Sequence, residues 1–291
     1  MNELLKFELS EIPSNIILTI GIGEEGANAV NYMKKKEISG VDYLLLSNGI
    51  AEKELVKYRL VFILMGTGDR NDIGVAMVIA AMTKILNILT IGIVAIPFVK
   101  GNQVMNQFLA EIDSLKDTLD LLIIIPDDQR KSLSNKLDIS PIYGKDLQIK
   151  MLAVQTISDL TNFTGYISTD FADVYSATRN SRFGTITTGG ASGENKTMNA
   201  LKKALSSSLM TLENIRKSKN ILLYIVSGLD DVTLAELGDT IDYFQKTVHS
   251  DGEILWNFGL DSDIGDKVRI TIIGTGLDKP PVFDWSLIPK R

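Results

Sequence analysis

A glycine-rich turn between an apolar strand-like run and a helical pattern constrains this chain more than any other stretch. The run spans residues 16–20, and the turn contains Gly21, Gly23 and Gly26. In α/β proteins such a turn holds phosphates, because backbone N–H groups point outward and the helix dipole favours an anion. Here Glu24 and Glu25 stand inside the turn. The sequence therefore predicts a phosphate-loop fold whose hold on a phosphate is weak or lost.

The first half of the chain alternates expected strands with expected helices. Near-continuous apolar strands separated by amphipathic helices indicate a parallel sheet that is covered on both faces. The expected strands are 16–20, 43–47, 60–65, 90–96 and 119–125, and the expected helices are 28–36, 75–86 and 103–117. A long helix over 145–162 follows.

The second half has a mixed α+β pattern. Strands are expected at 183–187, 221–226, 253–258 and 267–275, with a helix at 195–209 and another that begins with a capping box of Thr233 and Glu236. The apolar stretch 75–98 is interrupted by Asn87, Gly92 and Pro97. A membrane span needs about 20 uninterrupted apolar residues, so this stretch favours a buried helix followed by a central strand.

Composition excludes several classes of function. The formal net charge is −6 and no lysine or arginine block is present, which argues against a nucleic-acid-binding groove. The chain has no cysteine and a single histidine, His249, so disulfides, zinc–cysteine sites and multi-histidine metal sites are excluded. We expect no metal site. Residues 1–14 lack the pattern of a signal peptide, and we expect a cytoplasmic protein.

Several motifs appear in the order and spacing of one family. Residues 168–174 read S-T-D-F-A-D-V, residues 191–196 read A-S-G-E-N-K, and residues 263–271 read D-I-G-D-K-V-R-I-T. Together with the glycine turn, this ordered set resembles the FtsZ/tubulin family over residues 15–277. The resemblance implies a Rossmann-like GTPase-type domain with a parallel sheet (1–144), a central helix and the start of a synergy loop (145–167), and a smaller α+β activation-like domain (168–291).

The same resemblance implies the site residues. The first phosphate loop would use Gly21, Gly23, Gly26 and Asn28, and the second loop would use Gly66, Gly68, Arg70 and Gly74. In the family, the synergy loop of one subunit positions the attacking water on the nucleotide of its neighbour. Asp170 and Asp173 would fill that catalytic role. Their alternative role is to cap or solvate a loop.

The expected nucleotide face departs from the family pattern. The family's second loop reads G-G-G-T-G-T-G, whereas residues 68–74 read G-D-R-N-D-I-G, so the loss of internal glycines removes backbone freedom and room. With Glu24 and Glu25, Asp69 and Asp72 place four carboxylates where a polyphosphate would lie. The connection 48–59 is much shorter than in the family. Leu147 and Gln148 stand where an acidic or amide pair would contact guanine, although Asp146 is one residue away.

Two further readings stay open at this point. Gly21-x-Gly23-x-x-Gly26 is also a dinucleotide fingerprint, but the second strand ends at Leu46-Ser47-Asn48, without the acid that binds a ribose hydroxyl. We favour an FtsZ-like cell-division protein, a pseudo-GTPase of the cytoskeleton that acts through protein–protein contacts with itself or an authentic FtsZ. It would have no cofactor, or GTP/GDP if the site survives, and no direct membrane anchor. The alternative is an active, filament-forming GTPase.

Overall fold

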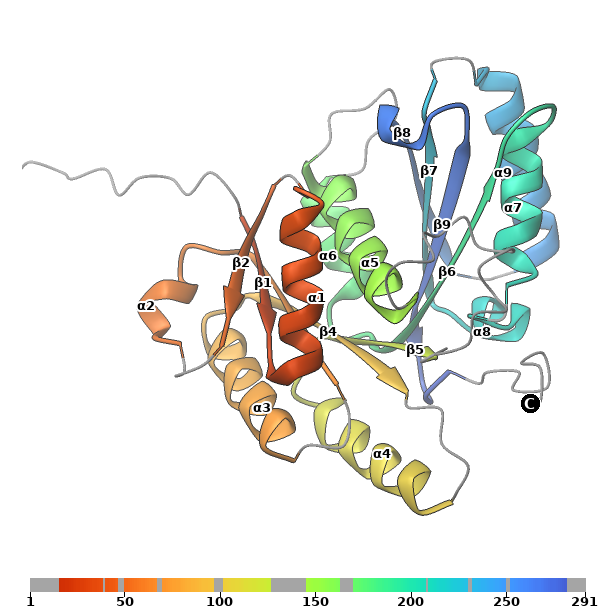
Figure 1. The fold of residues 1–291 in the computed structure, drawn as a ribbon. Helices are drawn as coiled ribbons and strands as arrows, with labels where there is room; N and C mark the ends of the chain where they lie inside the picture. The colour runs from red at the N-terminus through yellow and green to blue at the C-terminus, as the bar shows by residue number, and fades with distance from the viewer. Residues whose placement is uncertain are drawn as a thin grey trace, which may run out of the picture.

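The computed structural model describes residues 16–38, 40–46, 50–66, 70–96, 102–126, 145–162, 170–207, 209–229, 232–249 and 252–281. Within them, nine strands form one sheet in the order β2-β1-β3-β4-β5-β6-β9-β7-β8 (Figure 1). The strands are β1 (Ile17–Gly21), β2 (Val41–Leu45), β3 (Leu60–Met65), β4 (Leu89–Ile96), β5 (Leu121–Pro126), β6 (Arg182–Ala191), β7 (Asn220–Ser227), β8 (Glu253–Leu260) and β9 (Val268–Leu277).

Most neighbouring strands in this sheet are parallel. The exception is β9, which runs antiparallel to both β6 and β7. The continuous apolar sequence of β3 is buried along its whole length, as expected for a strand with helices on both faces. The predicted α/β class, with a parallel first half and a mixed second half, is confirmed. The predicted domain limit at 144/145 adjoins the start of α5, the limit at 167/168 lies outside the described residues, and both stay a prediction.

The helices cover both faces of the sheet. They are α1 (Gly23–Lys35), α2 (Glu52–Leu55), α3 (Arg70–Ile85), α4 (Asn102–Leu115), α5 (Lys145–Asn162), α6 (Phe171–Thr178), α7 (Lys196–Leu205), α8 (Leu212–Arg216) and α9 (Leu234–Val248). Two of them begin earlier than predicted, α1 at Gly23 rather than 28 and α3 at Arg70 rather than 75. Apolar periodicity does not mark these first turns, which carry acidic residues that stabilise a helix start.

The hydrophobic core has three parts. One lies between the sheet and α1, α5 and α6; a second lies on the opposite face under α3 and α4; a third lies under α7, α8 and α9. Helix α5 crosses the middle of the molecule (Figure 1). Its core also contains Leu222, Tyr224 and Ile273 from β7 and β9. Helix α5 therefore packs against strands from both halves of the sheet and joins them through one apolar core.

Candidate functional site

The glycine turn connects β1 directly to α1 at the carboxyl end of the sheet. The Ile22 amide donates to the Leu64 carbonyl on β3 over 2.9 Å, which fixes the turn to the neighbouring strand. A Cβ atom placed on Gly26 would lie 2.2 Å from the Leu64 carbonyl oxygen, and one placed on Gly21 would lie 2.5 Å from the Gly26 carbonyl oxygen. These two glycines are therefore required for close packing of α1 on the sheet.

Two acidic side chains occupy the space around the remaining glycines. Gly23 has a φ of +67°, and a Cβ on it would lie 1.9 Å from Oδ2 of Asp72, in the first turn of α3. A Cβ on Gly66 would lie 2.6 Å from the carboxyl carbon of Glu25. The carboxylates of α1 and α3 thus lie against the backbone of both loops, where a phosphate would need to approach.

A buried lysine holds one of these carboxylates. Lys150 lies on α5 and its side chain is fully buried, while the Glu25 side chain is 52% exposed. The Lys150 ammonium donates to Oε2 of Glu25 over 3.4 Å. A buried ammonium requires an anionic or polar partner, because taking a charge out of water is costly. Sequence patterns did not point to Lys150, since Glu25 is 125 positions away along the chain.

The other residues predicted for the phosphate loops lie in different surroundings. Asn28 is exposed on α1. Gly74 is exposed on α3 with nothing within 4 Å of its Cβ position, and it lines a groove with Leu46 and Ile50. Gly68 and Asp69 lie outside the described residues, and Arg70 is described only as the first residue of α3. The structure therefore brings together Gly21, Gly23, Gly26 and Gly66 of the predicted set.

Asp170 and Asp173 form the first turn of α6. The Asp173 amide donates to Oδ1 of Asp170 over 2.9 Å, and the Asp170 amide donates to Oδ2 of Asp173 over 3.1 Å. This reciprocal arrangement is a capping box, and both residues are exposed. The capping arrangement given above as their alternative role is present, and the catalytic role stays a prediction. One carboxylate oxygen of each residue takes no part in the box.

The two acidic helix starts lie at opposite ends of the molecule. Glu25 contacts Lys150 in the first half of α5, whereas α6 follows the other end of α5. From Lys150 to the end of α5 at Asn162 the helix rises about 18 Å at 1.5 Å per residue. Asp170 and Asp173 are thus too far from the glycine turn of their own chain to act there, so any action on a phosphate loop requires a second subunit.

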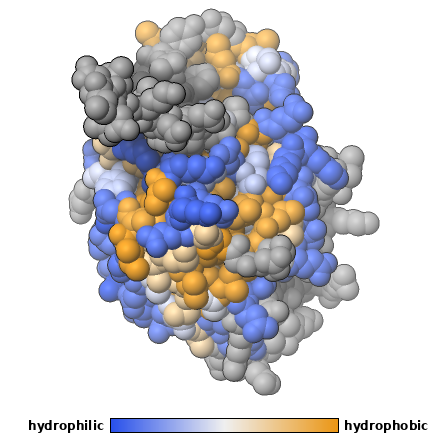
Figure 2. Space-filling model, turned by 90° about the vertical axis from the view of Figure 1, so that its left-hand side faces the viewer, coloured by the Kyte–Doolittle hydropathy of each residue, from blue (hydrophilic) through white to orange (hydrophobic). Residues whose placement is uncertain are grey.

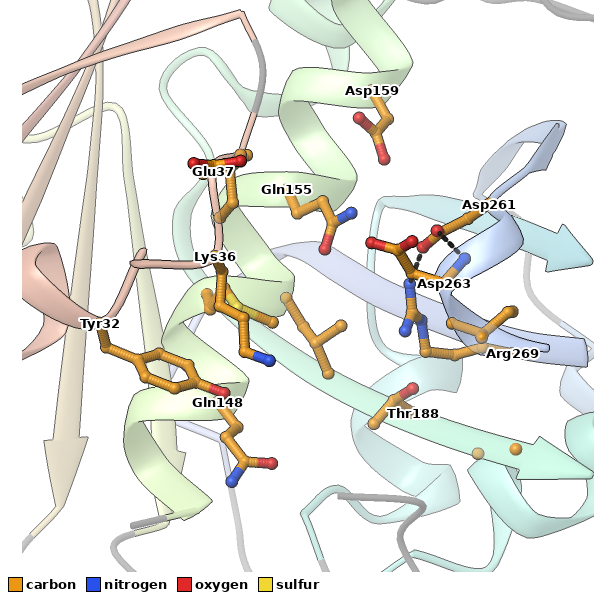
Figure 3. A pocket seen from close by; sticks show the side chains of 16 residues that line it. Tyr32, Lys36, Glu37, Gln148, Gln155, Asp159, Thr188, Asp261, Asp263 and Arg269 are labelled. Atoms are coloured by element: carbon orange, nitrogen blue, oxygen red, sulfur yellow. Dashed lines mark hydrogen bonds and ion pairs between the residues drawn. The ribbon is translucent and has the colours of Figure 1, made fainter. Parts of the chain in front are cut away.

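A polar cavity that the sequence did not predict lies between α1, α5 and the strands β6 and β9 (Figure 3). It has a volume of about 320 Å³. Burial is the main cause that raises the pKa of Asp159, to about 7, while a hydrogen bond with Tyr224 and the charge of Arg269 oppose the increase. The Arg269 guanidinium also donates to Asp261 over 3.4 Å. Gln148, predicted near guanine, is buried and lines this cavity.

The described residues contain no group of three or more histidine, cysteine, aspartate or glutamate side chains that could hold a metal ion. None of the helices in the described part of the chain is long and apolar enough to cross a membrane.

Comparison with known proteins identifies the family. Residues 183–278 match the model of the FtsZ family C-terminal domain. The cell division protein FtsZ of Buchnera aphidicola subsp. Acyrthosiphon pisum is 30% identical over 98% of this chain and 85% of its own length. An FtsZ W319Y mutant structure from M. jannaschii has a TM-score of 0.75 at 22% identity, covering 90% of this chain and 91% of that one.

A more distant structure shares the fold. GDP-form protofilaments of TubZ from Bacillus thuringiensis serovar israelensis give a TM-score of 0.66 at 12% identity, covering 92% of this chain and 85% of that chain. At such identity the likeness shows the fold alone. The Buchnera relative, which the chain matches over nearly its whole length, carries the family assignment. This chain belongs to the FtsZ family.

Proposed function

We propose that this FtsZ-family chain works through protein–protein contacts and that it binds GTP and GDP very weakly or not at all. The observation that carries the proposal is the position of two carboxylates on the phosphate loops. Glu25 lies over Gly66 and is held by Lys150, and Asp72 lies against Gly23. A phosphate entering this space would have to displace both side chains.

Steric exclusion and electrostatic repulsion both oppose phosphate binding at these loops. Lys150 neutralises Glu25, so Glu25 acts by filling space and by engaging the lysine. Glu24 and Asp72 supply the repulsion, since two like charges about 6 Å apart cost on the order of 3 kcal/mol at an effective dielectric constant of about 20. Micromolar binding is worth about 8 kcal/mol. Two such repulsions, together with the loss of the Glu25–Lys150 ion pair, would remove most of this binding free energy.

Isothermal titration calorimetry with GTP and with GDP tests this proposal. We expect no heat of binding at micromolar ligand, both with and without magnesium. The double variant Glu24→Gly with Glu25→Gly should also fail to bind, because Asp72 remains against Gly23 and the connection 48–59 remains short. Micromolar affinity of the unmodified chain would instead support the alternative, an active GTP-hydrolysing member of the family.

The expected partner is an authentic FtsZ in the same cell, with a second copy of this chain as the other candidate. The end that carries Asp170 and Asp173 keeps the acidic pair expected of the family's synergy loop, and both residues are exposed. At the opposite end, the carboxylates of Glu25 and Asp72 fill the space beside the phosphate loops. Such a subunit would dock one end on a filament and would not accept the next subunit, so it would act as a one-sided cap.

A mixing experiment tests the capping role. The chain is added substoichiometrically to polymerising FtsZ, and light scattering and phosphate release are followed. We expect shorter filaments, and Asp170→Asn with Asp173→Asn should change phosphate release at the capped interface. Asparagine keeps the capping hydrogen bonds while removing the charge. Asp239→Asn with Asp242→Asn, on the exposed side of α9, is the matched control. Unchanged scattering and phosphate release at equimolar chain would reject the capping role.

A further inference from the structure

Helix α3 exposes an apolar stripe on the outer side of the molecule. Val78 is 61% exposed, and Ile85 is 81% exposed, the highest value for a large apolar side chain in the described part of the chain. Val75 and the half-buried Met82 lie on the same side of the helix. Figure 2 shows apolar residues gathered on this side of the molecule. A contiguous apolar stripe on a surface helix marks a contact with a partner.

The stripe carries no charge. The exposed residues beside it are Asn71, Gly74 and Ala81, which are all uncharged. Lys84 is exposed on α3 as well, but its ammonium donates to the Asp117 carbonyl over 3.3 Å and therefore lies toward the turn before β5. The whole chain has a net charge of −6, so two copies that meet on a charged surface repel each other. On this stripe two copies can meet without placing like charges together.

The spacing of the stripe is symmetric about its midpoint. Its members are separated by three, four and three residues, the spacing of paired helices: Val75, Val78, Met82 and Ile85. In a two-fold contact, a residue i that meets residue j of the other copy is matched by residue j meeting residue i. An antiparallel pair of α3 helices satisfies this condition, because Val75 then faces Ile85 and Val78 faces Met82. We propose that two copies of this chain associate through α3 as an antiparallel, two-fold pair.

A groove beside α3 provides the space for the most exposed side chain of the stripe. The groove has a volume of about 430 Å³ and lies between α3 and two apolar residues that follow β2, Leu46 and Ile50. Gly74 and Val75 line its α3 side. In the antiparallel pair, Ile85 of the second copy lies opposite Val75 and so enters this groove. Gly74 has nothing within 4 Å of its Cβ position, which allows the second helix to approach closely.

The α3 contact is separate from the end of the molecule that carries Asp170 and Asp173. Helix α3 packs on one face of the sheet, in the core that it shares with α4, whereas α6 packs in the core on the opposite face. Pairing through α3 therefore leaves the start of α6 accessible. A two-fold contact closes with two copies, so it gives a dimer and not a filament. The inference depends neither on nucleotide binding nor on the capping role.

Sedimentation equilibrium of the full chain without nucleotide tests the pairing. We expect a species of twice the chain mass at micromolar concentration. Val78→Lys should weaken the dimer about tenfold or more, because it would bury an unpaired ammonium in the contact. The position is exposed in the single chain, so this variant keeps its fold. The matched control is Leu234→Lys, at a 75% exposed apolar position on α9, which should leave the dimer unchanged.

Because the chain contains no cysteine, single cysteines can report the direction of the two helices. With Val78 facing Met82, the two-fold axis passes level with residue 80, so the two copies of Ala81 lie beside it. The two copies of Asn71 lie at opposite ends of the pair, about 27 Å apart along the helices at 1.5 Å per residue. Both residues are exposed. Under mild oxidation, Ala81→Cys should therefore form an interchain disulfide much faster than Asn71→Cys.

Several results would overturn the proposal. A chain that stays monomeric at every concentration, or a dimer that Val78→Lys leaves intact, would show that α3 is not the contact. Disulfide formation by Asn71→Cys that is as fast as that by Ala81→Cys would contradict the antiparallel arrangement. The variant Asp170→Asn with Asp173→Asn should keep the dimer, and loss of the dimer in this variant would assign the contact to α6 instead. A failed capping experiment would leave all of these outcomes unaffected.

Discussion

The first turns of α1 and α6 both carry two acidic residues, yet the structure uses them differently. In α6, Asp170 and Asp173 satisfy each other's backbone amides and remain exposed. In α1, the residue before the helix makes no side-chain cap, and Glu25 instead extends over Gly66 to the buried Lys150 on α5. Both pairs complement a helix dipole. Acidic residues at a helix start can therefore stay exposed as caps, or they can fill the space of a binding loop, and a buried partner such as Lys150 decides between the two.

The largest expected effect concerns Gly26, which close packing requires, in contrast to Gly74, which has open space around it. Gly26→Ala should lower the free energy of unfolding by at least about 3 kcal/mol, because the new Cβ would lie 2.2 Å from the Leu64 carbonyl oxygen. Gly74→Ala should raise it by about 0.5–1 kcal/mol, since the site is helical and open. Urea denaturation measures both. A tolerated Gly26→Ala would indicate that this glycine is not kept for packing.

The second prediction tests whether the α1 acids are structural. Glu25→Ala should destabilise the fold by about 2 kcal/mol, because it removes an ion-pair partner of a buried ammonium. The matched control Glu24→Ala should cost less than about 0.5 kcal/mol. In a double-mutant cycle with Lys150→Leu, the coupling between Glu25 and Lys150 should be about 1 kcal/mol or more. Purely additive effects would contradict the pairing.

The third prediction concerns the α6 acids. Asp170→Ala should lower the free energy of unfolding by about 1 kcal/mol through loss of the N-cap, and Asp170→Asn should restore most of it. Because the box is local, Lys150→Leu should add to the effect of Asp170→Ala without coupling. Thermal and urea unfolding of the single and double variants provide the check. Measurable coupling would mean that the two helix starts are not independent.

The smallest expected effect concerns Asp159, a carboxylate away from either helix start. Its pKa is raised to about 7 in the folded chain from its ordinary value of 3.8, so the folded state binds the proton more tightly. The stability that this proton contributes is complete below pH 3.8 and is lost as the pH rises through about 7.

The variant Asp159→Asn cannot ionise. Its stability relative to the unmodified chain should therefore increase between pH 5 and pH 8 by about 1 kcal/mol, after allowance for partial exposure. This corresponds to a melting-temperature difference of about 2–4 °C. Differential scanning calorimetry at both pH values measures it. A difference that is the same at pH 5 and pH 8 would show that Asp159 does not titrate in this range.

Local sequence patterns predicted the elements and their class. The apolar strand 60–65 and the long helix 145–162 match β3 and α5. Such elements can be predicted because their hydrophobic periodicity is a property of neighbouring residues. The capping boxes at Asp170 and Thr233 were also visible, since both partners lie within one helical turn. Predictions that depended on apolar residues alone, such as the first turns of α1 and α3, began too late along the chain.

Only the tertiary structure decided how the acidic residues are used. The sequence, through its resemblance to the family, predicted that Glu24, Glu25 and Asp72 stand where the family has glycines. It did not determine that Glu25 reaches Lys150, that Asp72 lies against Gly23, or that Asp159 lies among Tyr224 and Arg269. The physical reason is that charge interactions depend on distance and burial. Those quantities arise only when segments far apart in the sequence pack onto one sheet.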